Sequence, residues 1–266
     1  MEGDKRFKIY HIPVLAFFSR ELYRDVARNC KGTTFGYLFL LLLLCWIPLA
    51  MNLHRGVADF VEQEAPKLVS QIPEITITDG EVSIDEPEPY FVRDPDTGAA
   101  LVVIDTTGEI SSLADTEAVG LVTKNAVTFE KNAYETRTFS FRDIDYFVLT
   151  QGKIYGWLDI VKRFAAPVLY PFCVLGVFVY RILQALLYAA FGLLIARIVK
   201  TELSYDSLLR LSVVAVTPAI IVATLLAMAS IHLPMGGLWY FLATMSYLTF
   251  GILAAKPKGE QCFGFS

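Results

Sequence analysis

The chain has 266 residues, of which 55% are hydrophobic, and a mean hydropathy of +0.48, which excludes an ordinary soluble domain. Its net charge of −4 divides into −10 for residues 54–165 and +6 for the remainder, so we expect acidic and basic parts in different compartments. The acidic balance of residues 54–165 argues against nucleic acid as their partner.

Cysteine and histidine are too scattered to form a reactive or metal-binding cluster. None of the four cysteines lies within residues 54–165, so that segment has no disulfide framework. The three histidines form no cluster with the cysteines. We therefore expect neither a metal nor a cofactor.

Residues 1–33 are predicted to be a cytoplasmic N-terminal segment with an amphipathic helix over Pro13–Asn29. Arg20, Arg24 and Arg28 follow one another at i, i+4 and i+8, which suits contact with anionic lipid headgroups. The alternative is a helix that packs on the protein's own cytoplasmic loop.

Three membrane spans follow from apolar length, because about 20 apolar residues cross a bilayer. They are predicted at residues 34–54, 211–231 and 238–255, and the last two are separated by an outer turn at 232–237. The uncharged run after Leu211 is long enough for two spans, and Pro234, Gly236 and Gly237 break it.

The apolar block Phe164–Ala196 is too long for one perpendicular span and short for two. We assign residues 166–200 to an interfacial segment, which contains Pro167 and Pro171, followed by one span from about Gly176. Residues 201–210 are then a cytoplasmic loop, and residues 256–266 are a cytoplasmic tail.

The distribution of Lys and Arg orients these spans. The N-terminal segment, the 200–210 loop and the tail carry these residues, and the 232–237 turn carries none. Both termini are therefore predicted to be cytoplasmic, and residues 55–165 extracytoplasmic. Trp157 and Trp239 then fall at the outer interface, where indole rings are favoured.

The 55–165 segment changes from helical spacing to the alternation typical of strands. Asp79-Gly80 between two alternating runs predicts a hairpin over Ile75–Ile84, and a second hairpin is predicted over Tyr90–Asp105. Weaker strands are predicted at Gly120–Thr123, Ala126–Glu130 and Thr136–Phe141, and helices at Arg142–Thr150 and Ile154–Phe164. The fold class is thus an α-helical integral membrane protein with about four transmembrane helices and an inserted extracytoplasmic α+β domain.

No motif in that domain points to catalysis. Asp105-Thr106-Thr107-Gly108 resembles the Asp-Thr-Gly of aspartic proteases, but that chemistry needs two carboxylates and only one such segment is present. The acidic turns near Asp94 and Asp96 match no cation-binding loop and are expected to be solvated.

The apolar blocks hold three features of interest. Arg181 is a lone charge, which is either a functional residue, an anchor that snorkels from the outer third of its span, or part of a structural pair. Thr217 and Pro218 predict a kink, with a hinge or binding point as the alternative. Two ridges of small residues are candidates for close helix packing, with each other or on a partner. These ridges consist of Ala215, Ala219, Ala223 and Ala227, and of Ala185, Ala189, Gly192 and Ala196.

Three stretches carry a resemblance to a known family: Phe17–Val26, Ile75–Tyr90 and Tyr205–Pro218. They are similar to a bacterial membrane family known as domain-of-unknown-function 1189, which is distantly similar to the Yip family of multi-span membrane proteins. The resemblance spans nearly the whole chain. It implies a location in the bacterial inner membrane and carries over no catalytic residue.

We expect a non-enzymatic accessory, scaffold or sensing subunit of an envelope complex, because packing ridges and a displayed domain occur without a reactive constellation. Its partners are then the lipid bilayer and a protein in the membrane or periplasm. A small transporter or lipid-handling protein with a lipid ligand is the alternative, and a membrane-bound hydrolase is a third hypothesis.

Overall fold

The structure is a computed structural model that describes residues 9–28, 33–132, 135–231 and 233–256. Its contacts divide the chain into two units, Leu53–Ala166 and Met1–Asn52 together with Pro167–Ser266. Four helices of the described residues are long and apolar enough to cross a membrane, which fits the predicted fold class. They are Thr34–Val69, Gln151–Ile198, Tyr205–Met228 and Gly236–Ala255.

The N-terminal segment is two short helices rather than the single helix expected over residues 13–29. The 3-10 turn η1 (Ile9–His11) leads into α1 (Ile12–Leu15), and α2 covers Arg20–Arg28. The prediction missed the break because apolar spacing continues through it. Ser19 ends the break, since its hydroxyl accepts a hydrogen bond from the Leu22 backbone N–H and caps α2.

Helix α3 (Thr33–Asp59) does not end near residue 54 but continues into the π-helical turn η2 (Phe60–Glu64) and α4 (Ala65–Val69). The helical sequence does not break at Pro66. Pro66 occupies the first turn of α4, where a missing N–H costs little, and the wider π turn immediately precedes it.

Helix α5 (Gln151–Ile198) is continuous over 48 residues, so the segment before Gly176 is helical and joins the following span without a break, and its interfacial location stays a prediction. Pro167 and Pro171 lie inside this helix. They are spaced by four, so the two lost backbone bonds fall in adjacent turns, and helical sequence continues on both sides of them. Tyr170, between the prolines, donates a 2.6 Å hydrogen bond to the Leu43 carbonyl of α3.

The third apolar helix begins earlier than predicted and is divided. Helix α6 (Tyr205–Ala215) starts within the expected 201–210 loop, because Ser204 caps it by accepting from the Ser207 N–H. Val216 separates it from α7 (Thr217–Met228), which agrees with the interruption that Pro218 predicts. Helix α8 (Gly236–Ala255) follows the turn.

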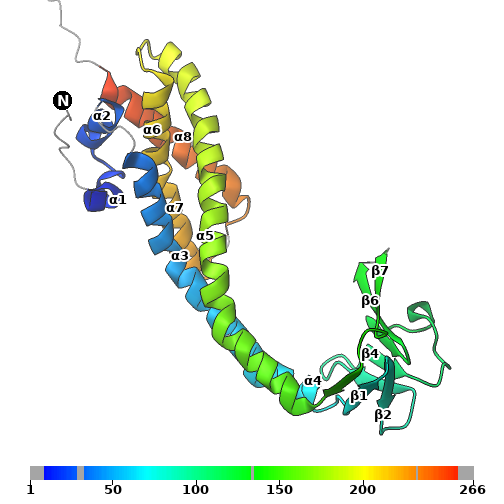
Figure 1. Cartoon of the computed structure of the whole chain (residues 1–266). Coiled ribbons are helices and arrows are strands. Elements are labelled where there is room, and N and C mark those ends of the chain that lie inside the picture. Colours follow the sequence, from blue (N-terminus) through cyan, green and yellow to red (C-terminus); the bar gives the residue numbers. More distant parts are fainter. Residues whose placement is uncertain (1–8, 29–32, 133–134, 232, 257–266) are drawn as a thin grey trace, which may run out of the picture. The chain divides into compact units, whose positions relative to one another are not determined.

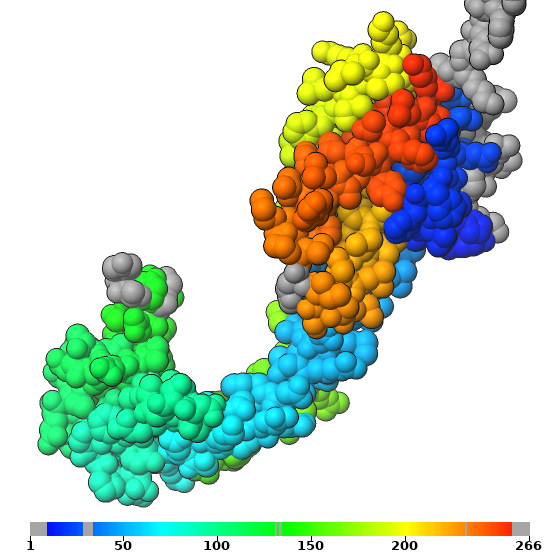
Figure 2. Space-filling model, turned by 180° about the vertical axis from the view of Figure 1, so that it is seen from behind, coloured from blue at the N-terminus to red at the C-terminus, as the bar shows by residue number. Residues whose placement is uncertain are grey.

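In the unit formed by Met1–Asn52 and Pro167–Ser266, the core surrounds α6, which contacts both α2 and α8 (Figure 1). Every residue from Arg210 to Ile220 is buried. Helix α2 contributes Leu22, Tyr23 and Val26 to this core, and Figure 2 shows the N-terminal segment, in blue, packed against α8 in orange and red.

The Leu53–Ala166 unit contains two sheets. One has the order β2-β1-β8 and the other β3-β4-β5-β6-β7, with a single parallel pair, β4 and β5. Residues 106–119 connect that pair and cover one face, where Val103 and Leu121 are buried with Leu113 of the 3-10 turn η3 (Leu113–Asp115). The strands are β1 (Ile75–Thr78), β2 (Glu81–Ile84), β3 (Tyr90–Arg93), β4 (Ala100–Asp105), β5 (Gly120–Thr123), β6 (Ala126–Asn132), β7 (Glu135–Ser140) and β8 (Tyr146–Leu149).

Both predicted hairpins and the three weaker strands are confirmed, but the helix expected over residues 142–150 is wrong. That segment contains β8, which pairs antiparallel with β1. Tyr146, Phe147 and Val148 favour a strand once a neighbouring edge is available, and β1 supplies that edge. Helix begins only at Gln151.

Candidate functional site

Arg181 begins a chain of polar side chains along one face of α5. Its Nη1 donates a 2.6 Å hydrogen bond to Gln184 Oε1, and Gln184 Nε2 donates a 2.7 Å bond to the Tyr188 hydroxyl. The Tyr188 ring lies 5.8 Å from that of Phe241 in α8. Gln184 and Tyr188 were not predicted from the sequence, although a polar residue one turn after a lone charge is a usable signal.

The charge of Arg181 is incompletely satisfied. Its Nε is buried and has no hydrogen-bond partner among the described residues, and its guanidinium lies 5.8 Å from the Tyr180 ring centroid. Because α5 is continuous, Arg181 lies roughly midway between Arg163 and Arg197. Its position in the outer third of a span stays a prediction.

Thr217 connects the α6–α7 joint to α3. Its side chain is fully buried, and its hydroxyl lies 3.1 Å from the Tyr37 hydroxyl. The Thr217 hydroxyl also donates a 3.5 Å hydrogen bond to the Val213 carbonyl. This bond partly compensates for the backbone hydrogen bond that Pro218, which has no N–H, cannot make. The joint is thus held by a buried interhelical hydrogen bond.

The two small-residue ridges have different environments. Leucines of two other helices pack closely against Gly192 on α5. A Cβ at this position would lie 3.3 Å from Leu208 Cδ2 and 3.5 Å from Leu248 Cδ2. Its companions Ala185, Ala189 and Ala196 are buried. The second ridge is buried at Ala215 and Ala219, half-buried at Ala223 and exposed at Ala227.

Of the three arginines of α2, two contact other parts of the protein and the third faces solvent. Arg24 donates through Nε to the Ala254 carbonyl at 3.0 Å, at the C-terminal end of α8, where a cation stabilises the helix. The Arg20 guanidinium lies 5.7 Å from the Phe250 ring centroid, and Arg28 is exposed.

The Asp105 carboxylate accepts hydrogen bonds from groups close to it in the sequence. It is fully buried and accepts hydrogen bonds from the Thr107 hydroxyl and from the N–H groups of Thr107, Gly108 and Ile110. Burial alone raises the pKa of this carboxyl, but these bonds outweigh burial and hold its pKa below the ordinary value. The residue terminates a strand and organises a turn.

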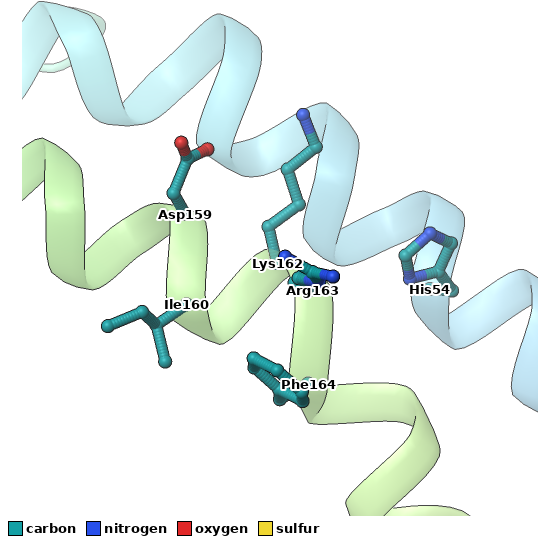
Figure 3. Close-up of a pocket in the computed structure, with 6 residues that line it drawn as sticks. All are labelled: His54, Asp159, Ile160, Lys162, Arg163 and Phe164. Atoms are coloured by element: carbon teal, nitrogen blue, oxygen red, sulfur yellow. The ribbon is translucent and has the colours of Figure 1, made fainter.

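A cavity of about 430 Å³ lies beside α3 and α5 within the Leu53–Ala166 unit (Figure 3). It combines cationic, acidic and apolar side chains, none of which was predicted from the sequence as a site residue. The lining residues are His54, Asp159, Ile160, Lys162, Arg163 and Phe164. His54 comes from α3 and the others from α5, so only the fold brings them together.

A second hollow, of about 380 Å³, lies between α7 and α8 and is almost entirely apolar. Pro218 and Ala219 contribute from α7, Trp239 and Tyr247 from α8, and Phe17 from the N-terminal segment. Proline at the joint thus also shapes a groove.

Among the described residues, no three His, Cys, Asp or Glu side chains are grouped as a metal site. Searches of curated proteins and of solved structures found no match. The family model described as a protein of unknown function, DUF1189, matches residues 14–252. That match covers both units, so the chain belongs to the DUF1189 family.

Proposed function

We propose that the chain is a non-enzymatic protein of the bacterial inner membrane, an accessory, scaffold or sensing subunit that holds a partner protein. In this proposal both termini are cytoplasmic, and residues 55–165 are displayed outside the cytoplasm. The distant relationship to the Yip family stays a prediction from the sequence.

The observation that carries the proposal is the β6–β7 hairpin. Strand β7 is the last strand of its sheet, and all six of its residues are exposed. Val127 pairs with Phe139 and Phe129 pairs with Arg137, so these four side chains share one face. Phe129 is 43% exposed and Phe139 56% exposed.

This hairpin suits protein recognition. An edge strand offers unpaired backbone groups, and exposed aromatic side chains supply the apolar contact that interfaces favour. The opposite face is polar, with the hydroxyls of Thr128 and Thr138 2.9 Å apart. The two faces therefore provide a test site and a matched control on the same strand.

The test places a photoreactive amino acid at Phe139 or at Thr138 in the full-length protein, cross-links whole cells, and purifies the protein in mild detergent. We expect mass spectrometry to identify one stoichiometric polypeptide joined at position 139 and much less at position 138. Phe139→Ser should release that polypeptide without lowering the unfolding temperature. Absence of an adduct, or equal adducts at both positions, contradicts the proposal.

A lipid-handling role is the second candidate, because the α7–α8 groove is apolar and of a size suited to an acyl chain. Ala243 lines that groove, whereas Leu242 beside it is exposed and does not. Ala243→Phe is expected to remove co-purifying lipid, and Leu242→Phe to leave it unchanged. Equal lipid content in both variants would count against this role.

A further inference from the structure

The cavity of Figure 3 lies at a change of composition along both helices that flank it. The run Gly32 to His54 carries no charge, and Arg55 follows it directly. On α5, the apolar block begins at Phe164, directly after Lys162 and Arg163. His54, Arg163 and Phe164 all line the cavity, so both helices pass from apolar to charged sequence at its level. Such a change marks the boundary between hydrocarbon and headgroups.

The cations of the cavity differ in availability. Lys162 Nζ lies 2.6 Å from Glu62 Oε1, so a carboxylate of the protein already balances its charge. Arg163 is exposed and makes no ion pair with any residue that the structure describes. Its guanidinium lies 5.5 Å from the Phe164 ring centroid, and its donors stay available. Among the residues that the structure describes, Asp159 is the one carboxylate that lines the cavity.

Apolar side chains accompany the free cation. Ile160 is 57% exposed and Phe164 49% exposed, and both line the cavity. Trp157, on the same helix, is 51% exposed and stacks on Phe147, which suits an interfacial anchor. The surface thus offers an unpaired guanidinium above an apolar patch, which is complementary to an amphiphile with an anionic head.

We propose that this cavity binds the phosphate group of an anionic phospholipid, in the leaflet next to residues 53–166. Arg163 is the principal ligand, His54 faces the same space, and Ile160 and Phe164 contact the upper part of an acyl chain. The site is separate from the β6–β7 hairpin, so lipid binding here can be tested independently of the proposed protein partner.

The test titrates the full-length protein in a neutral detergent with phosphatidylglycerol, phosphatidylcholine or inorganic phosphate, and counts bound molecules by native mass spectrometry. We expect tight binding of phosphatidylglycerol alone. Arg163→Gln should weaken it about fivefold, the effect of one cation near a membrane surface, and Arg163→Lys should restore part of it.

Arg55→Gln is the matched control, because Arg55 lies at the same boundary and does not line the cavity. We expect it to bind like the unaltered protein. Equal phosphatidylglycerol binding by Arg163→Gln and Arg55→Gln overturns the proposal, as does equal affinity for phosphatidylcholine. Competition by inorganic phosphate at the same concentration assigns the site to a soluble anion and overturns the lipid assignment. Unfolding temperatures of all variants show whether any of them fails to fold.

Discussion

Arg181 and Gln184 have unequal roles in stability. Gln184→Leu leaves the Arg181 Nη1 without its acceptor, and we expect a loss of about 1–3 kcal/mol in the free energy of unfolding. Arg181→Leu leaves Gln184 Oε1 without its donor but also removes a guanidinium whose Nε is already buried without a partner among the described residues, so we expect it to cost less than Gln184→Leu. Thermal unfolding of both variants in one detergent measures the difference. If Arg181→Leu costs as much as Gln184→Leu, Arg181 is a structural residue.

Asp105 gives the Leu53–Ala166 unit a defined dependence on acid. The pKa of Asp105 is lower in the folded protein than in the unfolded chain, where it is about 3.9. Its contribution to the free energy of unfolding is therefore complete above the unfolded pKa and is lost as the pH falls through the folded pKa. We expect stability to change little from pH 7 to 5 on this account and to fall below about pH 4. Asp105→Asn should cost about 1–3 kcal/mol at pH 7 and remove this part of the acid sensitivity.

The measurement is unfolding of the full-length protein at pH 7 and pH 3.5. Asp96→Asn is the control, since Asp96 is an exposed turn residue, and we expect it to behave like the unaltered protein. Unchanged stability of Asp105→Asn at pH 7 would mean that the turn does not depend on its hydrogen bonds.

At the scale of elements, Gly251 determines how closely α2 approaches α8. A Cβ at Gly251 would lie 2.6 Å from Tyr23 Cδ1, and Tyr23 is fixed by a 2.8 Å hydrogen bond to the Ala16 carbonyl. Gly251→Ala should therefore destabilise this packing by about 1–3 kcal/mol. Gly176→Ala in α5 meets no atom within 4 Å and should be neutral or stabilising. Limited proteolysis of the N-terminal segment compares the two variants.

Local chemistry was sufficient to predict some elements and insufficient for others. Asp79 and Gly80 both have positive φ, 51° and 77°. Few residue pairs other than Asp-Gly favour a turn with two such residues, so the sequence alone predicts the hairpin. Strand β8 was not, because its strand state depends on pairing with β1, far away in the chain. The Figure 3 cavity was missed for the same reason, since His54 and Arg163 meet only through the packing of two helices.

At the scale of the whole molecule, charge asymmetry and helix length together predict the topology. In the proposed topology α5 crosses the membrane once between the acidic unit and Glu202, and we expect the turn near Met235 to lie on the same side of the membrane as the acidic unit. Ser111, Glu202 and Met235 are exposed, so cysteines there are accessible to a probe.

We expect an impermeant maleimide to label Ser111→Cys and Met235→Cys in intact spheroplasts, in a background in which the four native cysteines are replaced by serine. Glu202→Cys should react only after permeabilisation. If α5 crossed the membrane twice, Ser111→Cys and Glu202→Cys would lie on the same side and would be labelled under the same conditions. A continuous 48-residue helix does not reverse its direction, so we expect it to cross only once. Labelling of Glu202→Cys alone would instead reverse the orientation and place the acidic unit in the cytoplasm. Each of the three positions thus reports on a different part of the topology.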